Sequence, residues 1–146
     1  MKIEKVKIND LNQINSLEKT TFKDDSFSKE TIEQLLYNNT FFFKLLNSNE
    51  KIIGFVIVLE QERNTLNIIS LLIKEGYRNM GLGSFLLNHV LMEVEKSQIF
   101  KRIILNVRTS NLSALKLYKN HDFRIIKEID NYYRIGDNAF LMELKL

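Results

Sequence analysis

The sequence predicts a mixed α/β fold, with a mostly antiparallel central sheet of about seven strands flanked by about four helices. First, apolar runs of strand length alternate with amphipathic stretches of helical period, in the order βααβββαβαββ. Second, three of these runs follow one another between residues 41 and 73 with only short polar turns, which indicates an antiparallel meander. Third, a glycine-containing loop and a helix lead from the last of these runs to the next strand, which indicates a parallel crossover.

The N-terminal part predicts one strand and two helices. Apolar and charged residues interleave over Lys2–Ile8, which favours a short strand. Asp10 is a good N-cap, and apolar residues recur after it at near-helical spacing as far as Phe22. Ser28 begins a second helix. The buried stripe of that helix is expected to consist of Ile32, Leu35 and Leu36.

The middle of the chain predicts three strands joined by polar turns. Turn residues stand at Asn47–Glu50 and at Asn64–Thr65. The strands that they separate are expected at Phe41–Leu46, Ile52–Glu60 and Leu66–Ile73.

Helical spacing returns after residue 80. An amphipathic helix is expected over Gly81–Lys96, and a short apolar strand at Ile103–Val107 follows it. A further helix is expected over Asn111–Asn120. The last two strands are expected at Phe123–Ile129 and Ala139–Leu146.

Composition excludes several classes of site. The 146 residues, 45% hydrophobic and 27% charged, suit one globular domain that covers residues 1–146. Absence of cysteine excludes disulfides, thiolate metal sites and a cysteine nucleophile. The two histidines, His89 and His121, are far apart in sequence, so no metal site is predicted. His89 is expected to pack at the edge of an apolar stripe and His121 to lie near a helix C-terminus, and neither receives a catalytic role.

Charge and hydropathy indicate neither a nucleic-acid partner nor a membrane partner. The net charge is +3, but the 21 lysines and arginines are spread along the chain, whereas nucleic-acid binding needs a basic face. No apolar stretch approaches the roughly 20 residues of a membrane-spanning helix. The N-terminus lacks the apolar core of a signal peptide, so a cytoplasmic location is expected.

The most informative motif is the loop before the third expected helix, which reads Arg78-Asn79-Met80-Gly81-Leu82-Gly83-Ser84. Glycines allow a ligand to approach the backbone closely, and a helix start offers free N–H groups to a pyrophosphate. A dinucleotide-binding fingerprint needs a small residue where Leu86 stands, and a P-loop needs lysine where Ser84 stands. On the loop alone, an ordinary strand-to-helix turn stays open as an alternative.

The remaining pattern, Arg/Gln-x-x-Gly-x-Gly/Ala, resembles the acetyl-CoA pyrophosphate loop of the GNAT superfamily of N-acetyltransferases. Asn111-Leu112-Ser113-Ala114-Leu115-Lys116-Leu117-Tyr118 with Asp122-Phe123 is similar to the family segment Asn-x-x-Ala-x-x-Leu-Tyr-x-x-x-Gly-Phe. Asp122 stands where that segment has glycine, at a position that needs a tight helix exit. The resemblance covers roughly Ile52 to Met142, well over half of the chain.

The C-terminal third is similar to one branch of that superfamily, the RimI-type ribosomal-protein alanine N-acetyltransferases and related protein N-terminal acetyltransferases. The segments that carry this similarity are Val107–Asn111, Asn131–Tyr133 and Gly136–Met142. The resemblance implies an enzyme that transfers an acetyl group from acetyl-CoA directly to a primary amine, most simply a protein N-terminal α-amine. It implies no metal. A small-molecule amine as acceptor and a catalytically weak CoA-binding module stay open as alternatives.

The resemblance also implies roles for individual residues on the cofactor side. Leu71, Leu72 and Ile73 would pair with the pantetheine arm. Asn111 would either contact the cofactor or cap its own helix, and Tyr118 would protonate the leaving thiolate. The residues that would hold the pyrophosphate are Arg78, Asn79, Met80, Gly81, Leu82, Gly83 and Ser84.

On the acceptor side, the family's usual glutamate or histidine base is replaced by Asn106, whose amide cannot take a proton at physiological pH. We expect Asn106 and Tyr77 to hold a water at this point, with Glu75 as the alternative carboxylate. An α-amine of pKa near 8 is already partly neutral at pH 7, which favours it over a lysine. The acceptor peptide would contact Phe27, Asn131, Tyr132 and Tyr133, and the protein would be a monomer or a homodimer.

Overall fold

A single sheet organises the computed structural model, which describes residues 1–134 and 136–146. The strands are β1 (Lys2–Lys5), β2 (Phe41–Leu46), β3 (Ile52–Glu62), β4 (Thr65–Ile73), β5 (Arg102–Arg108), β6 (Arg124–Ile129) and β7 (Ala139–Lys145). Within the described residues they form a seven-stranded sheet in the order β1-β2-β3-β4-β5-β7-β6. All neighbouring pairs are antiparallel except β4 and β5, which are parallel. The predicted fold class and the predicted order of elements are confirmed.

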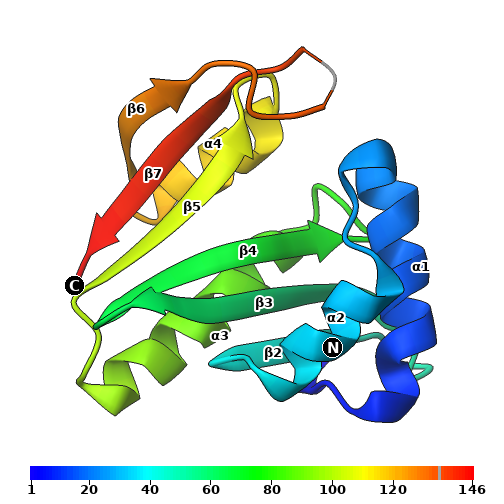
Figure 1. The fold of residues 1–146 in the computed structure, drawn as a ribbon. Coiled ribbons are helices and arrows are strands. Elements are labelled where there is room, and N and C mark those ends of the chain that lie inside the picture. The colour runs from blue at the N-terminus through cyan, green and yellow to red at the C-terminus, as the bar shows by residue number, and fades with distance from the viewer. Residues whose placement is uncertain (135) are drawn as a thin grey trace.

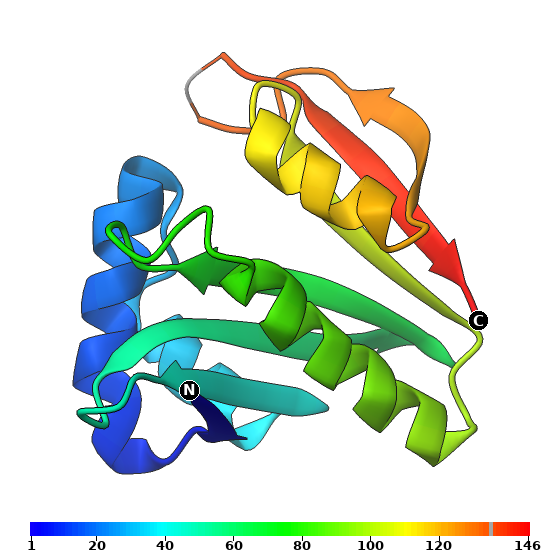
Figure 2. The ribbon, with the colours of Figure 1, turned by 180° about the vertical axis from the view of Figure 1, so that it is seen from behind.

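Helices cover both faces of the sheet. They are α1 (Leu11–Phe22), α2 (Lys29–Tyr37), α3 (Leu82–Ser97) and α4 (Leu112–Asn120). In Figure 1, α2 lies in front of the sheet, and Figure 2 shows α3 and α4 on the opposite face. Each face has its own buried cluster: Ile14 of α1 and Ile32 of α2 pack on one side, and Leu86 of α3 and Leu115 of α4 on the other. None of the helices in the described ranges has the length and apolar character needed to cross a bilayer.

The predicted side-chain cap is present at the start of α2 but not at the start of α1. Ser28 caps α2, because its side chain accepts a hydrogen bond from the Thr31 N–H at 3.2 Å. Residues Ile8–Asp10 form a 3-10 turn and β1 ends earlier, at Lys5, so the expected strand over Lys2–Ile8 is too long. Because this turn precedes α1, the Asp10 carboxylate points back to the Lys7 N–H, and it also pairs with Lys44, each at 2.8 Å. Asp10 therefore stands at the N-cap position of α1 without capping it through its side chain.

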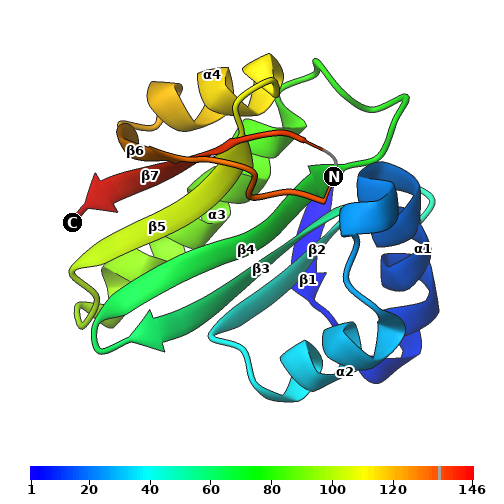
Figure 3. The ribbon, with the colours of Figure 1, turned by 45° about the horizontal axis from the view of Figure 1, so that its top comes forward.

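The parallel pair of strands separates partway along its length. The register of β4 with β5 runs only from Thr65, opposite Arg102, to Ile68, opposite Leu105. Opposite β3, a register shift next to Ile68 adds one residue to β4 at this point. Beyond it, β4 continues toward α1 while β5 turns away, and Figures 1 and 3 show the two strands opening into a V. Among the described residues the facing edges of both strands are unpaired inside this V, and such an edge exposes backbone N–H and C=O groups to a ligand.

Candidate functional site

The loop between β4 and α3 is exposed, and its backbone passes through the left-handed region just before the helix. Asn79 and Gly81 have positive φ angles of 63° and 76°. Gly81 is the N-cap of α3, and a β-carbon there would meet no atom within 4 Å. The N–H groups of the first helical turn, on Leu82, Gly83 and Ser84, have no acceptor inside the helix. The loop can therefore offer several N–H donors and a positive helix end to a phosphate.

Close packing holds this loop against its neighbours. A β-carbon on Gly83 would lie 3.3 Å from Leu117 Cδ2, so glycine at this position allows α3 to approach α4 closely. At the C-cap of α4, His121 contacts Ser84 Oγ through Nε2 at 3.1 Å, which ties the same two helices together. Arg78 Nε donates to the carbonyl oxygen of Ile73 at 2.8 Å and fixes the loop to the end of β4. Three residues assigned to the pyrophosphate from the sequence, Arg78, Gly83 and Ser84, thus also have structural contacts.

The predicted pantetheine segment lies on the unpaired arm of β4. Leu71 and Ile73 pack toward α3 and α4, whereas Leu72 is buried on the α1–α2 side. The backbone of these residues faces β3 on one edge and the V on the other. Their assignment to a cofactor arm stays a prediction.

Helix α4 carries Tyr118, which belongs to the buried cluster on the α3–α4 face of the sheet. The residue is 7% exposed, and its ring makes a T-shaped contact with Phe123 at a centroid distance of 5.6 Å. Burial raises the pKa of the Tyr118 hydroxyl well above its ordinary value, and the neighbouring Tyr133 raises it further. The phenol therefore stays protonated at neutral pH. Asn111 caps this helix, because its side chain accepts a hydrogen bond from the Ala114 N–H at 3.2 Å.

Asn106 lies on the unpaired arm of β5. Its Nδ2 donates to the Tyr132 hydroxyl at 3.4 Å, and its Oδ1 is buried without a partner in the described part of the chain. Turning the amide over would only leave its nitrogen in that position, so one polar atom is unsatisfied either way. A buried polar atom usually has a hydrogen-bond partner in the protein, in ordered water or in a ligand, so Asn106 Oδ1 can accept one more hydrogen bond.

The predicted partnership of Tyr77 with Asn106 has no support from hydrogen bonds of the described residues. The Tyr77 hydroxyl accepts from Asn47 Nδ2 at 3.2 Å, in the turn between β2 and β3. The physical reason is the pairing of Ile73 with Gly54, which places the end of β4 beside that turn. Glu75, the alternative carboxylate, is exposed.

The expected acceptor residues come from two segments that meet across the V. In the loop between β6 and β7, the rings of Tyr132 and Tyr133 lie 4.9 Å apart, and burial raises the pKa of Tyr133 to about 12. Asn131 has a positive φ of 51° and its N–H donates to Asn138 Oδ1 at 3.0 Å. Phe27 lies in the segment between α1 and α2 and packs against the cluster on that face.

Glu18 is a buried carboxylate that connects Phe27 to the sheet. The residue is 1% exposed. One oxygen accepts from the Phe27 N–H at 3.0 Å and the other from Ser70 Oγ of β4 at 3.2 Å. Burial raises the pKa of Glu18, although both hydrogen bonds favour the ionised form.

Glu18→Gln is expected to reveal this raised pKa as a pH-dependent difference in stability. Between the ordinary pKa of a glutamate and the raised value, the folded wild type binds more protons than the unfolded chain. The wild-type free energy of unfolding therefore falls as pH rises through that window, whereas the glutamine variant lacks this loss. Urea unfolding of both proteins, from about pH 4 to about pH 8, should show the variant gaining relative stability with rising pH.

Glu18→Ala is the matched comparison, since it also removes the acceptor of the Phe27 N–H. Relative to Glu18→Gln, it should cost about 1–3 kcal/mol at every pH, the usual penalty for an unsatisfied buried donor. A constant difference between wild type and Glu18→Gln across the pH range would contradict the raised pKa.

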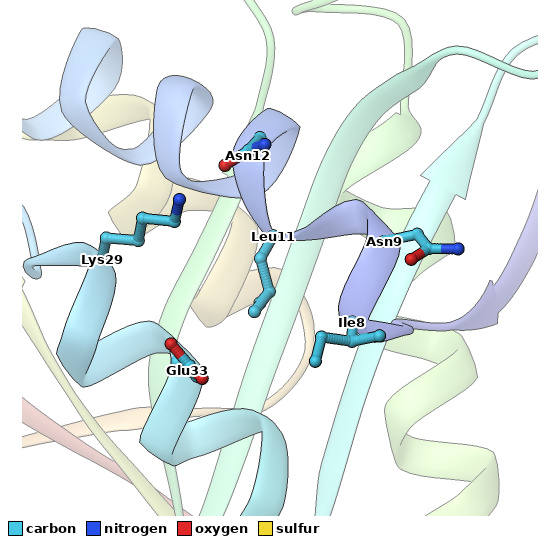
Figure 4. Close-up of a pocket in the computed structure, with 6 residues that line it drawn as sticks. All are labelled: Ile8, Asn9, Leu11, Asn12, Lys29 and Glu33. Carbon is cyan, nitrogen blue, oxygen red and sulfur yellow. The ribbon is translucent and has the colours of Figure 1, made fainter.

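Two surface hollows lie along α1. One, of about 540 Å³, lies between the turn before α1 and the start of α2, as Figure 4 shows. No residue predicted from the sequence to bind cofactor or acceptor lines it. A second, of about 750 Å³, runs along α1 beside Glu75 and Arg78. Within residues 1–134 and 136–146, no three His, Cys, Asp or Glu side chains are placed to hold a metal ion.

Comparison with known proteins identifies both relatives and the fold. An N-alpha-acetyltransferase of Sulfolobus acidocaldarius is 34% identical over 80 residues, which are 55% of this chain and 48% of that protein. The ribosomal-protein-S18-alanine N-acetyltransferase of Escherichia coli has the same fold, with a TM-score of 0.87, 24% identity and coverage of 99% and 92% of the two chains. Arabidopsis thaliana Naa50 in complex with the bisubstrate analogue CoA-Ac-MVNAL gives a TM-score of 0.85 at 25% identity, covering 99% and 98%.

The matches differ in how much of each protein they cover. The chain spans about half the length of the curated relatives it matches. The sequence model of the acetyltransferase (GNAT) family, in contrast, matches residues 8–123. That range includes the V of β4 and β5, the glycine loop and the whole of α4. The chain therefore belongs to the acetyltransferase (GNAT) family.

Proposed function

We propose that the protein transfers the acetyl group of acetyl-CoA directly to the N-terminal α-amine of a protein. The observation that carries the proposal is the V between β4 and β5, which has an anion-binding loop on one arm and the unsatisfied Asn106 amide on the other. Donor and acceptor could thus approach one point from two sides. Similarity to proteins named N-alpha-acetyltransferase supports the choice of acceptor.

The donor side would use backbone more than side chains. Acetyl-CoA supplies an activated acetyl thioester. We propose that its pyrophosphate accepts hydrogen bonds from the N–H groups at the start of α3, from Leu82 to Ser84. The free edge of β4 from Leu71 to Ile73 would pair with the amides of the pantetheine arm, and an N–H of this edge would polarise the thioester carbonyl.

The acceptor side would orient the amine without a strong base. Asn106 Oδ1 would accept a hydrogen bond from the amine, and the Tyr132 hydroxyl would keep the amide in place. As the amine nitrogen bonds to the acetyl carbon, the carbon–sulfur bond would break and the amine would lose a proton to water. Tyr118 would protonate the leaving thiolate and then regain a proton from water. Because no carboxylate is required, an α-amine of pKa near 8 suits this site better than a lysine of pKa near 10.4.

The test is a turnover assay with matched acceptors. The purified protein and acetyl-CoA are incubated with peptides that have a free N-terminus, with the same peptides blocked at the N-terminus but containing lysine, and with small amines. We expect CoA release only with free N-termini, and mass spectrometry should locate the acetyl group at the α-amine. Turnover of small amines alone would favour the small-molecule acceptor, and CoA binding without any turnover would favour a binding module. The cytoplasmic location and the monomer or homodimer state stay predictions.

A further inference from the structure

Arg108, the last residue of β5, connects three segments that are distant in sequence. Its guanidinium forms an ion pair with Asp25, in the turn after α1, and another with Asp137 at 3.4 Å. The same group lies 4.2 Å from the ring centre of Tyr133, within the range of a cation–π contact. The Arg108 and Asp25 side chains are only 30% and 14% exposed, so solvent screens their ion pair less than one at the surface.

Further hydrogen bonds of Asp25 and Asp137 reinforce this connection. The second Asp25 oxygen accepts from the Arg134 N–H at 3.2 Å, so Asp25 contacts the β6–β7 loop itself as well as Arg108. Asp137 accepts from Ser110 Oγ at 2.6 Å, a hydrogen bond that holds its pKa below the usual range and keeps it ionised. Figure 3 shows the β6–β7 loop reaching across the open end of the sheet toward the segment after α1. We call Arg108, Asp25 and Asp137 the bridge.

The chemistry of the bridge needs arginine. A guanidinium is planar, carries its donors in a rigid fork, and can contact two carboxylates while one face lies on an aromatic ring. A lysine has the same charge but concentrates it at one point, so it cannot satisfy Asp25, Asp137 and the Tyr133 ring together. Loss of the arginine would leave the partly buried Asp25 carboxylate without a counter-charge.

We propose that Arg108 is a positioning residue for the acceptor, an inference that rests on the proposed function. The bridge holds the segment that carries Phe27 against the loop that carries Tyr132 and Tyr133. These two segments are the ones assigned to the acceptor, and neither includes the glycine loop assigned to the cofactor. Arg108 contacts no reacting atom and acts through the spacing of the two segments.

The kinetic test separates acceptor from cofactor. Asp25→Asn keeps the size of the side chain and breaks only the link to the segment after α1, and Arg108→Lys weakens both links. Each should raise the KM for the acceptor peptide about tenfold, the effect of one lost charge-assisted hydrogen bond, and leave the KM for acetyl-CoA and kcat within about twofold. Asp24→Asn is the matched control, since Asp24 is the exposed neighbour of Asp25.

Hydrogen exchange tests the bridge without relying on activity. Backbone amides of residues 23–28, 130–134 and 136–138 should exchange faster in Asp25→Asn and Arg108→Lys, while the amides of α3 keep their wild-type rates. Unchanged exchange in these segments, or an unchanged acceptor KM in an active enzyme, would overturn the inference. If the variants exchange faster but the wild type turns over no peptide, the proposed function is overturned. The positioning role then fails with it, but the bridge itself stands.

Discussion

Tyr118→Phe is expected to lower kcat about a hundredfold, the lower end of what a positioned general acid contributes. The variant removes one hydroxyl from a buried ring, and the T-shaped contact with Phe123 needs only the ring. The KM for acetyl-CoA should therefore change little. Because burial raises the pKa of Tyr118, the wild type should keep its proton donor at least to the ordinary tyrosine pKa of about 10, so this group causes no loss of kcat at neutral or mildly alkaline pH.

Steady-state kinetics of CoA release measures this effect, and Tyr37→Phe provides the control. Tyr37 lies at the end of α2 and is 64% exposed, so its hydroxyl has no proposed role. Thermal unfolding should confirm that both variants are folded. A kcat within twofold of the wild type for Tyr118→Phe would show that Tyr118 is a core tyrosine and that another group protonates the thiolate.

Gly81→Val should weaken acetyl-CoA binding about ten- to a hundredfold, the cost of one or two charge-assisted hydrogen bonds to a phosphate. Gly81 has a φ of 76°, which a β-branched residue does not adopt without strain. Its isopropyl group would also enter the open space in front of the first turn of α3. Both effects displace the N–H donors from the position that a pyrophosphate would occupy.

Gly76→Val is the matched control for backbone strain. Gly76 also has a positive φ, of 94°, and a β-carbon there also meets no atom within 4 Å, but it lies outside the first turn of α3. Equilibrium binding of CoA by calorimetry should separate the two variants. An equal loss of affinity in both would mean that loop strain, and not the phosphate contact, explains the result.

The candidate site could be predicted from the sequence wherever a role depends on local backbone geometry. The Gly81 turn, the Ser28 cap and the apolar stripes of the helices are set by residues within a few positions of one another. Asp122 belongs to the same group: it stands where the family has glycine, and its φ of 68° is the tight helix exit expected there. For Asn111 the sequence left two roles open, and the hydrogen bond to the Ala114 N–H shows capping.

Roles that depend on partners distant in sequence could not be predicted. The role of Tyr77 in holding a water with Asn106 stays a prediction, but the sequence did not show that its hydroxyl accepts a hydrogen bond from Asn47. Strand pairing creates this contact, because it brings the β2–β3 turn to the end of β4. Arg108 stands within the motif Val107–Asn111 and received no role, since nothing local connects it with Asp25, 83 residues away. The burial of Glu18 could not be predicted either, because an acidic residue on an amphipathic helix usually faces solvent.

The sequence by itself determined the order of strands and helices, the parallel crossover and the glycine turn before α3, since hydrophobic period and turn chemistry act over short distances. Only the tertiary structure decided where β4 and β5 separate, which side chains face each other across the V, and which charges are buried. These features arise from strand register and from packing of both helical layers, and each depends on residues that the chain brings together only when it folds.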